Sequence, residues 1–175
     1  MFLSSYAKIN LTLKINYKNK NNLHEIQSYF CLIDLADKIT IKKIKEKKDK
    51  VLFKGPFAKL VNKSNNSILS LFTLLRRLGL ISNFYSVTIV KNIPVFAGLG
   101  GGAANVATIL KYLFKRKIRR SLLNQVEDRV GSDLKLFFYN QGFMKNLGLI
   151  INIKKTHKLF FLLIKPSVKC STKEI

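Results

Sequence analysis

The loop that decides the fold reads Pro94-Val-Phe-Ala-Gly-Leu-Gly-Gly-Gly-Ala-Ala-Asn105, with four glycines in the five positions from Gly98 to Gly102. Clustered glycines let consecutive backbone N–H groups point into one concavity, where they can bind an anion. Apolar residues then recur at helical spacing, so a helix follows whose positive end adds to the attraction; they are Val106, Ile109, Leu110, Leu113 and Phe114. The sequence therefore predicts a phosphate site at the start of a helix.

Other glycine-rich anion sites fit the loop less well. A P-loop requires Lys and then Ser or Thr after its last glycine, whereas Ala103 and Ala104 follow here. The dinucleotide fingerprint G-x-G-x-x-(G/A) is met by Gly98, Gly100 and Ala103, but residues 108–126 contain no Asp or Glu to bind a ribose. A turn that only lets a helix approach a strand is the alternative without a ligand.

Strand and helix patterns surround the loop. Residues 6–16 alternate as a half-buried strand, with Ile9, Leu11, Leu13 and Ile15 on one face and Lys8, Asn10, Thr12 and Lys14 on the other. Further strands are predicted at 26–35, 39–41, 51–53, 85–89, 147–153 and 159–164, and helices at 67–78 and 121–130. Strands and helices come in blocks without strict alternation, so the predicted fold class is α+β.

The charge raises the question of a polyanionic partner. The 175 residues carry 32 Lys and Arg against 9 Asp and Glu, a net charge of +23. Such a balance favours nucleic acid. The basic residues are spread along the chain, however, and no nucleic-acid-binding module is visible, so we favour a solvated lysine-rich surface that suits an anionic small molecule, with no nucleic acid partner.

The composition also indicates where the protein is located and whether it binds a metal ion. The apolar content of 47% is that of a globular protein, and the late apolar run 159–164 is only six residues, so we predict no membrane partner and a cytoplasmic location. The two cysteines, Cys31 and Cys170, lie far apart with no nearby histidine cluster. Buried or idle thiols are therefore expected, with no metal-ligating residues.

Residues 94–105 resemble the second motif of the superfamily that includes galactokinase, homoserine kinase, mevalonate kinase and phosphomevalonate kinase, P-x-x-x-G-L-G-G-G-(S/T)-(S/A)-(N/D). Three further stretches resemble the 4-diphosphocytidyl-2-C-methyl-D-erythritol kinase family within it. Residues 5–15 are similar to its opening P-A-K-(I/L)-N-L-x-L, residues 23–28 to G-Y-H-x-(I/L)-Q, and Gly131-Ser-Asp133 to G-(A/S)-D-V-P.

The resemblance implies an activity and a set of site residues. The activity is ATP-dependent phosphorylation of the 2-hydroxyl of 4-diphosphocytidyl-2-C-methyl-D-erythritol in non-mevalonate isoprenoid synthesis, with ATP and Mg²⁺ as cofactors. Asp133 is the implied catalytic base, Lys8 and Asn10 assist it, and His24 contacts the cytosine. The same three residues and His24 bind the substrate. The residues implied to bind ATP are Pro94, Ala97, Gly98, Leu99, Gly100, Gly101, Gly102, Ala103, Ala104 and Asn105.

The resemblance also implies a domain organisation. Residues 1–155 would form the N-terminal kinase domain, of the ribosomal-protein-S5-domain-2-like fold with a left-handed βαβ connection. Residues 156–175 would begin a C-terminal domain that is largely missing, so a separately encoded C-terminal half is an expected partner. The chain departs from the family at Leu23, Ala103, Ala104 and Lys135. Another kinase of the superfamily, or an inactive truncated nucleotide-binding module, remains the alternative.

Overall fold

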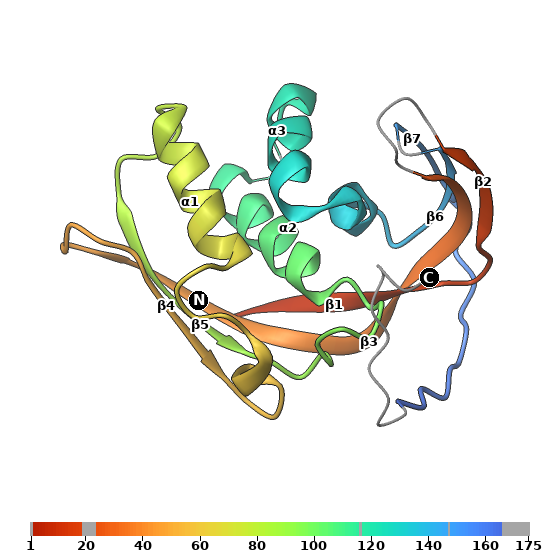
Figure 1. The fold of residues 1–175 in the computed structure, drawn as a ribbon, viewed down its shortest axis with the longest axis horizontal. Coiled ribbons are helices and arrows are strands. Elements are labelled where there is room, and N and C mark those ends of the chain that lie inside the picture. The colour runs from red at the N-terminus through yellow and green to blue at the C-terminus, as the bar shows by residue number, and fades with distance from the viewer. Residues whose placement is uncertain (1, 19–23, 116, 147, 166–175) are drawn as a thin grey trace.

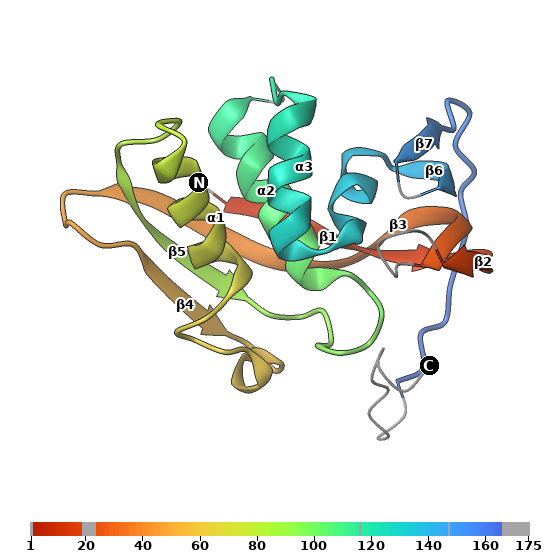
Figure 2. The ribbon, with the colours of Figure 1, turned by 45° about the horizontal axis from the view of Figure 1, so that its top comes forward.

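The structure is a computed structural model that describes residues 2–18, 24–115, 117–146 and 148–165. It has two layers. A twisted sheet forms one layer, and α1 (Ser67–Arg77), α2 (Gly101–Phe114) and α3 (Arg120–Val130) lie together on one face of it (Figures 1 and 2). The mixed, largely antiparallel sheet with its helices on one side confirms the predicted α+β class.

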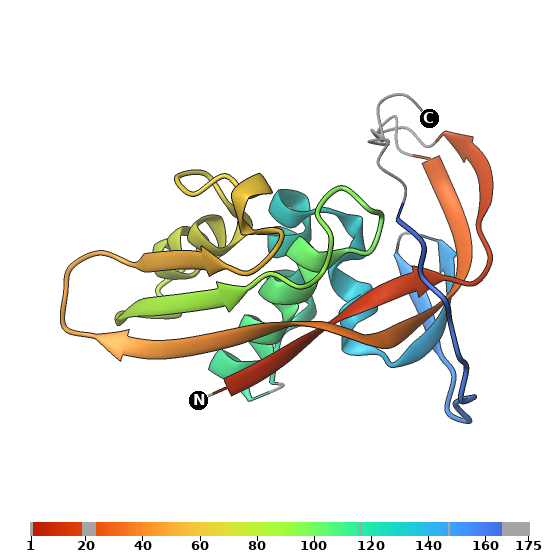
Figure 3. The same ribbon diagram turned by 90° about the horizontal axis from the view of Figure 1, so that it is seen from below.

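The sheet is organised around one long strand, β3 (His24–Ile44). It pairs antiparallel with β1 (Phe2–Asn10), β2 (Lys14–Lys18), β5 (Phe84–Val90) and β6 (Gln141–Asn146). The main strand order is β4-β5-β3-β6-β7. From the side without helices, β3 runs along the sheet from the β4–β5 end to the β2–β6 end (Figure 3). Both ends of the sheet are therefore fixed by the same strand.

A parallel pair leads toward the glycine loop. β4 (Lys50–Lys54) is parallel to β5, and the chain joins them through the 3-10 turn η1 (Ala58–Leu60) and α1. Asn66 caps α1 because its Oδ1 accepts hydrogen bonds from the N–H groups of Ile68 and Leu69, at 3.1 Å each. Gly79 follows the helix at φ +67°, as predicted for its end.

The core lies between the helices and the sheet. The apolar faces that the helical spacing predicted in α1 and α2 meet the inward residues of β3 and β5 there. Fully buried members include Ile39, Phe72, Leu75, Ile89, Val106 and Leu110. Cys31 is also buried, and burial raises the pKa of its thiol, as expected of an idle cysteine; Cys170 lies outside the described residues.

The predicted strand at 6–16 is wrong in two respects. It is broken at 11–13 into β1 and β2, and the expected faces do not form: Leu11, Leu13 and Ile15 are exposed, like Asn10 and Lys14 of the other face, whereas Lys8 is buried. The cause is a register shift between Tyr6 and Ala7, which interrupts the alternation and turns two consecutive residues inward. Pattern alone cannot show such a bulge.

The end of the chain differs most from the sequence prediction. The strand predicted at 147–153 is β7 (Leu149–Asn152), but 159–164 has no regular secondary structure. Its apolar side chains alternate in exposure, but the segment is not paired with a strand in the sheet. Strand β6 and the 3-10 segment η2 (Ser132–Phe138) were not predicted. No helix in the described part of the chain is long and apolar enough to cross a membrane.

Candidate active site

The glycine loop leaves β5 and ends in the first turn of α2. Gly98 and Gly100 have φ angles of +69° and +66°, a left-handed conformation that glycine adopts without steric cost. Gly100 is the N-cap of α2 and has no side chain to accept the hydrogen bonds of the first turn. The backbone N–H groups at the helix start are therefore not capped by a side chain of Gly100, and binding of an anion there stays a prediction.

Gly100 is also required by its neighbours. A Cβ atom at this position would lie 2.7 Å from the Phe137 ring and 3.3 Å from Oδ2 of Asp133. The backbone of the loop can approach the aspartate only because that Cβ is missing. The glycine spacing thus brings the anion site and the Asp133 carboxylate together.

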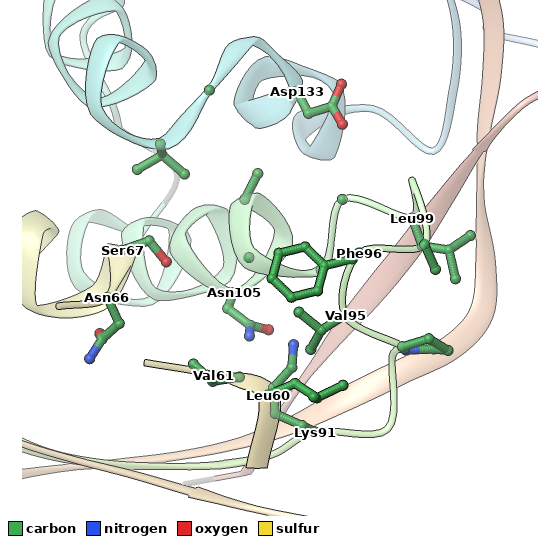
Figure 4. A pocket seen from close by; sticks show the side chains of 18 of the residues that line it. Leu60, Val61, Asn66, Ser67, Lys91, Val95, Phe96, Leu99, Asn105 and Asp133 are labelled. Carbon is green, nitrogen blue, oxygen red and sulfur yellow. The ribbon is translucent and has the colours of Figure 1, made fainter. Parts of the chain in front are cut away.

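A cavity of about 780 Å³ opens between the loop, the start of α1 and the start of η2. Figure 4 shows Asn66 and Ser67 on one side of it, Phe96 and Leu99 on the loop side and Asp133 across from them. Its size is within the range of small-molecule sites. The cavity joins the predicted phosphate loop to the predicted catalytic carboxylate.

Lys8 connects Asp133 to the loop. Its Nζ lies 3.3 Å from Oδ2 of Asp133 and donates a hydrogen bond to Oδ1 of Asn10 at 3.4 Å. Its backbone N–H donates to the carbonyl of Leu99 at 3.1 Å. The lysine side chain is 5% exposed and that of the aspartate 38%, so the ammonium is fixed in the protein while the carboxylate faces solvent. Such a carboxylate can accept a proton from a bound hydroxyl.

The alanines behind the glycines are buried in the core beneath the helix start. Ala104 is 1% exposed, whereas Ala103 also lines the cavity. Without hydroxyls at these positions, the backbone amides are the donors that the helix start offers. Asn105 is buried as well, and its Oδ1 has no hydrogen-bond partner among the described residues.

Two charged residues at the site were missed by the sequence analysis. Lys91 follows β5 and lines the cavity, and its ammonium forms an ion pair with Asp37 of β3. In a chain with 32 Lys and Arg, a single lysine after a strand carries no signal of its own. His24, by contrast, begins β3, where its backbone pairs with Lys18; its predicted contact with cytosine stays a prediction.

This fold and site define a class of protein. An α+β domain whose glycine-lined helix start faces a Lys–Asp pair is suited to transferring a phosphoryl group to a small molecule. Residues 66–132 match the family described as GHMP kinases N terminal domain. Over these residues the chain is similar to the N-terminal domain of the GHMP kinases.

Several curated relatives of the chain share one name. The chain is 34% identical over 183 residues to 4-diphosphocytidyl-2-C-methyl-D-erythritol kinase of Pelagibacter ubique, covering 99% of this chain and 63% of the relative. It is 32% identical over 179 residues to the kinase of that name from Caldanaerobacter subterraneus, covering 99% and 60%. The chain thus spans about three fifths of the length of these relatives.

Solved structures agree on the fold. A crystal structure of 4-(cytidine 5'-diphospho)-2C-methyl-D-erythritol kinase superposes with a TM-score of 0.64 at 23% identity, covering 87% of this chain and 55% of the other. Homoserine kinase from Cytophaga hutchinsonii gives 0.62 at 14% identity, covering 99% and 57%. At these identities the likeness supports the fold, and function is argued from the site.

Proposed function

We propose that this chain is the nucleotide-binding and catalytic part of a kinase that phosphorylates the 2-hydroxyl of 4-diphosphocytidyl-2-C-methyl-D-erythritol. The observation that carries the proposal is the placement of Asp133, paired with Lys8, beside Gly100 of the loop. The substrate is suggested by the names of the relatives. The whole reaction is proposed for the complete enzyme, because the chain spans only part of their length.

ATP would bind with its phosphates at the start of α2. The N–H groups of Gly101 and Gly102 lie in the first helical turn, where the helix dipole favours negative charge. The base and ribose would occupy the part of the cavity between the loop and Asn66. Residues 94–105 would thus surround the nucleotide, as the resemblance implies.

Mg²⁺ would accompany the nucleotide. This ion usually keeps several waters and is held by substrate phosphates and one or two carboxylates, so it needs no protein cage. The described residues contain no group of three or more metal-ligating side chains, but Asp133 presents one carboxylate at the cavity. The site therefore fits an ion carried by ATP, which would neutralise phosphate charge.

The phosphoryl transfer would be carried out by the chain's own polar residues. Asp133 accepts the proton of the 2-hydroxyl as that oxygen forms a bond to the γ-phosphorus, and the bond from this phosphorus to the β,γ-bridging oxygen breaks to release ADP. Lys8 stabilises the developing charge, while Asn10 accepts a hydrogen bond from its ammonium and holds it in place.

Substrate recognition completes the proposal. His24 would contact the cytosine, and Leu23 leaves out the aromatic stacking that the family's tyrosine supplies. We expect a small-molecule substrate with no nucleic acid or membrane partner, and a cytoplasmic location. The domain boundary at residue 155 also stays a prediction. A nucleotide-binding module without activity is the second candidate, favoured by the missing hydroxyls at Ala103 and Ala104.

The proposal is tested by ATP consumption with 4-diphosphocytidyl-2-C-methyl-D-erythritol, for the chain alone and with any separately encoded C-terminal half. Asp133→Asn is compared with Asp128→Asn, the same change at an exposed position on α3. We expect turnover to fall by about 10²–10⁴ only in the first variant, the usual contribution of a general base. No turnover in either preparation would reject the kinase assignment for this polypeptide.

A further inference from the structure

A second Lys–Asp pair lies beside the nucleotide cavity and has no role in the proposed transfer. Lys91 and Asp37 have side chains that are 5% and 0% exposed, and the Nζ of the lysine contacts Oδ2 of the aspartate. Burying two charges costs free energy that an ion pair only partly returns. A buried pair of this kind at the wall of a cavity therefore calls for a functional reason.

Asp37 holds the chain at the point where it enters the loop. Its Oδ1 accepts hydrogen bonds from the backbone N–H groups of Asn92 at 2.8 Å and Ile93 at 2.9 Å. The side chain of Asn92 in turn donates to the carbonyl of Ala36 at 3.0 Å. One carboxylate thus receives three donors from residues 91–93, immediately before Pro94, and fixes the direction of the Lys91 side chain.

The ammonium of Lys91 lies against the first turn of α2. A Cβ on Gly101 would be 3.3 Å from its Nζ and 3.0 Å from the side chain of Ile93. Glycine at this position therefore lets the lysine reach the helix start. The ammonium has two N–H groups beyond the one used by Asp37, and Lys91 lines the same cavity as Gly98 and Asp133.

Asn105 gives an independent sign of a ligand in this part of the cavity. It lies one turn after Gly101 on the same face of α2, is 3% exposed and has no hydrogen-bond partner for Oδ1 among the described residues. Figure 4 shows its amide turned toward Lys91. An unsatisfied buried oxygen costs free energy, and a nucleotide hydroxyl or amino group, or the ammonium once it turns to a phosphate, would remove that cost.

We propose that Lys91 binds a phosphate of the nucleotide and that Asp37 is the positioning residue that aims its ammonium at the start of α2. The inference rests on the proposed nucleotide-binding function. A positive side chain beside the positive end of a helix is unfavourable by itself, and a phosphate placed between the two is attracted by both. Asp37 keeps the ammonium there when the cavity holds no nucleotide.

The test compares binding of ATP and adenosine by calorimetry, using the chain as it exists. Two variants differ only at Lys91: Asp37→Asn, which retains the lysine, and Asp37→Asn with Lys91→Met, which removes it. Neither leaves a buried carboxylate unpaired, and the Asn oxygen can still accept from residues 92 and 93. Lys91→Met alone could unfold the protein, so the double variant carries the test.

We expect the double variant to raise the dissociation constant for ATP at least about tenfold relative to wild type, the factor for losing one charge-assisted hydrogen bond, with Asp37→Asn between the two because it keeps the lysine but loses the carboxylate that aims it. The dissociation constant for adenosine should change less than about threefold. An equal loss of affinity for ATP and adenosine, or no loss of affinity for either, would overturn the role of Lys91. The proposed kinase function would still be tested separately, by the ATP-consumption assay. Wild-type protein that binds ATP no more tightly than adenosine would also overturn the role of Lys91.

Discussion

Two Lys–Asp pairs flank the glycine loop, and they differ in whether the aspartate reaches solvent. In the Lys8–Asp133 pair the atoms are 3.3 Å apart and the aspartate is 38% exposed. In the Lys91–Asp37 pair the aspartate is fully buried and also accepts two backbone N–H groups. An exposed carboxylate can exchange a proton with a substrate, whereas one with three fixed donors is committed to holding the backbone. The same two residue types thus suit chemistry on one side of the loop and positioning on the other.

The largest effect should follow from breaking the buried pair. Asp37→Ala leaves the Lys91 ammonium buried without its carboxylate and removes the acceptor for residues 92 and 93. We expect the free energy of unfolding to fall by about 3–5 kcal/mol, the cost of an uncompensated buried charge. Urea denaturation measures it, with Asp34→Ala, at an exposed position on the same strand, as the control. Equal losses of unfolding free energy in Asp37→Ala and Asp34→Ala would contradict the role of Asp37 as the buried partner of Lys91.

Substitution in the Lys8–Asp133 pair should lower the rate of phosphoryl transfer more than it lowers the stability of the fold. Lys8→Met removes the charge behind Asp133 but leaves that carboxylate in contact with water. We expect kcat to fall by about 10²–10³, or about 2.7–4 kcal/mol, as for the loss of one fixed charge-stabilising donor. Steady-state kinetics with Lys14→Met, an exposed lysine of β2, gives the matched comparison. A kcat within threefold of wild type would show that Lys8 has no part in the transfer.

A substitution in the glycine loop between the two pairs should have the smallest effect, on the free energy of unfolding. Gly100 and Gly79 both have positive φ, but a Cβ at Gly79 meets nothing within 4 Å, whereas one at Gly100 meets the Phe137 ring at 2.7 Å. Gly100→Ala should therefore destabilise the protein by about 1–3 kcal/mol more than Gly79→Ala, the range for overpacking. Thermal or urea unfolding of the two variants measures the difference. Equal destabilisation would mean that the ring moves aside freely.

The glycine loop and the exposed pair could be predicted from the sequence for a physical reason. Four glycines before a helical repeat leave few other uses for their backbone N–H groups, and Lys8 and Asp133 stand in motifs. α1, α2 and α3 also carry their own signals, in apolar spacing and in the glycines at 79 and 131 that end α1 and α3.

The buried pair and the strand faces could not be predicted in the same way. Asp37 and Lys91 are 54 positions apart, and only the antiparallel pairing of β3 with β5 brings them together. The bulge at Tyr6 and Ala7, which turns Ala7 and the charged Lys8 inward together, depends on how β1 fits against β3. Long-range pairing of this kind leaves no local pattern in the residues themselves.

The division of labour between the two pairs is tested most directly by measuring kcat and KM for ATP in two variants side by side. Asp133→Asn should lower kcat by about 10²–10⁴ with little change in KM for ATP, because it removes a proton acceptor. The double variant Asp37→Asn, Lys91→Met should raise KM for ATP about tenfold, because it removes a phosphate contact. If Asp133→Asn acts on KM alone, or the double variant lowers kcat as much as Asp133→Asn does, the assignment of chemistry to one pair and nucleotide binding to the other is wrong.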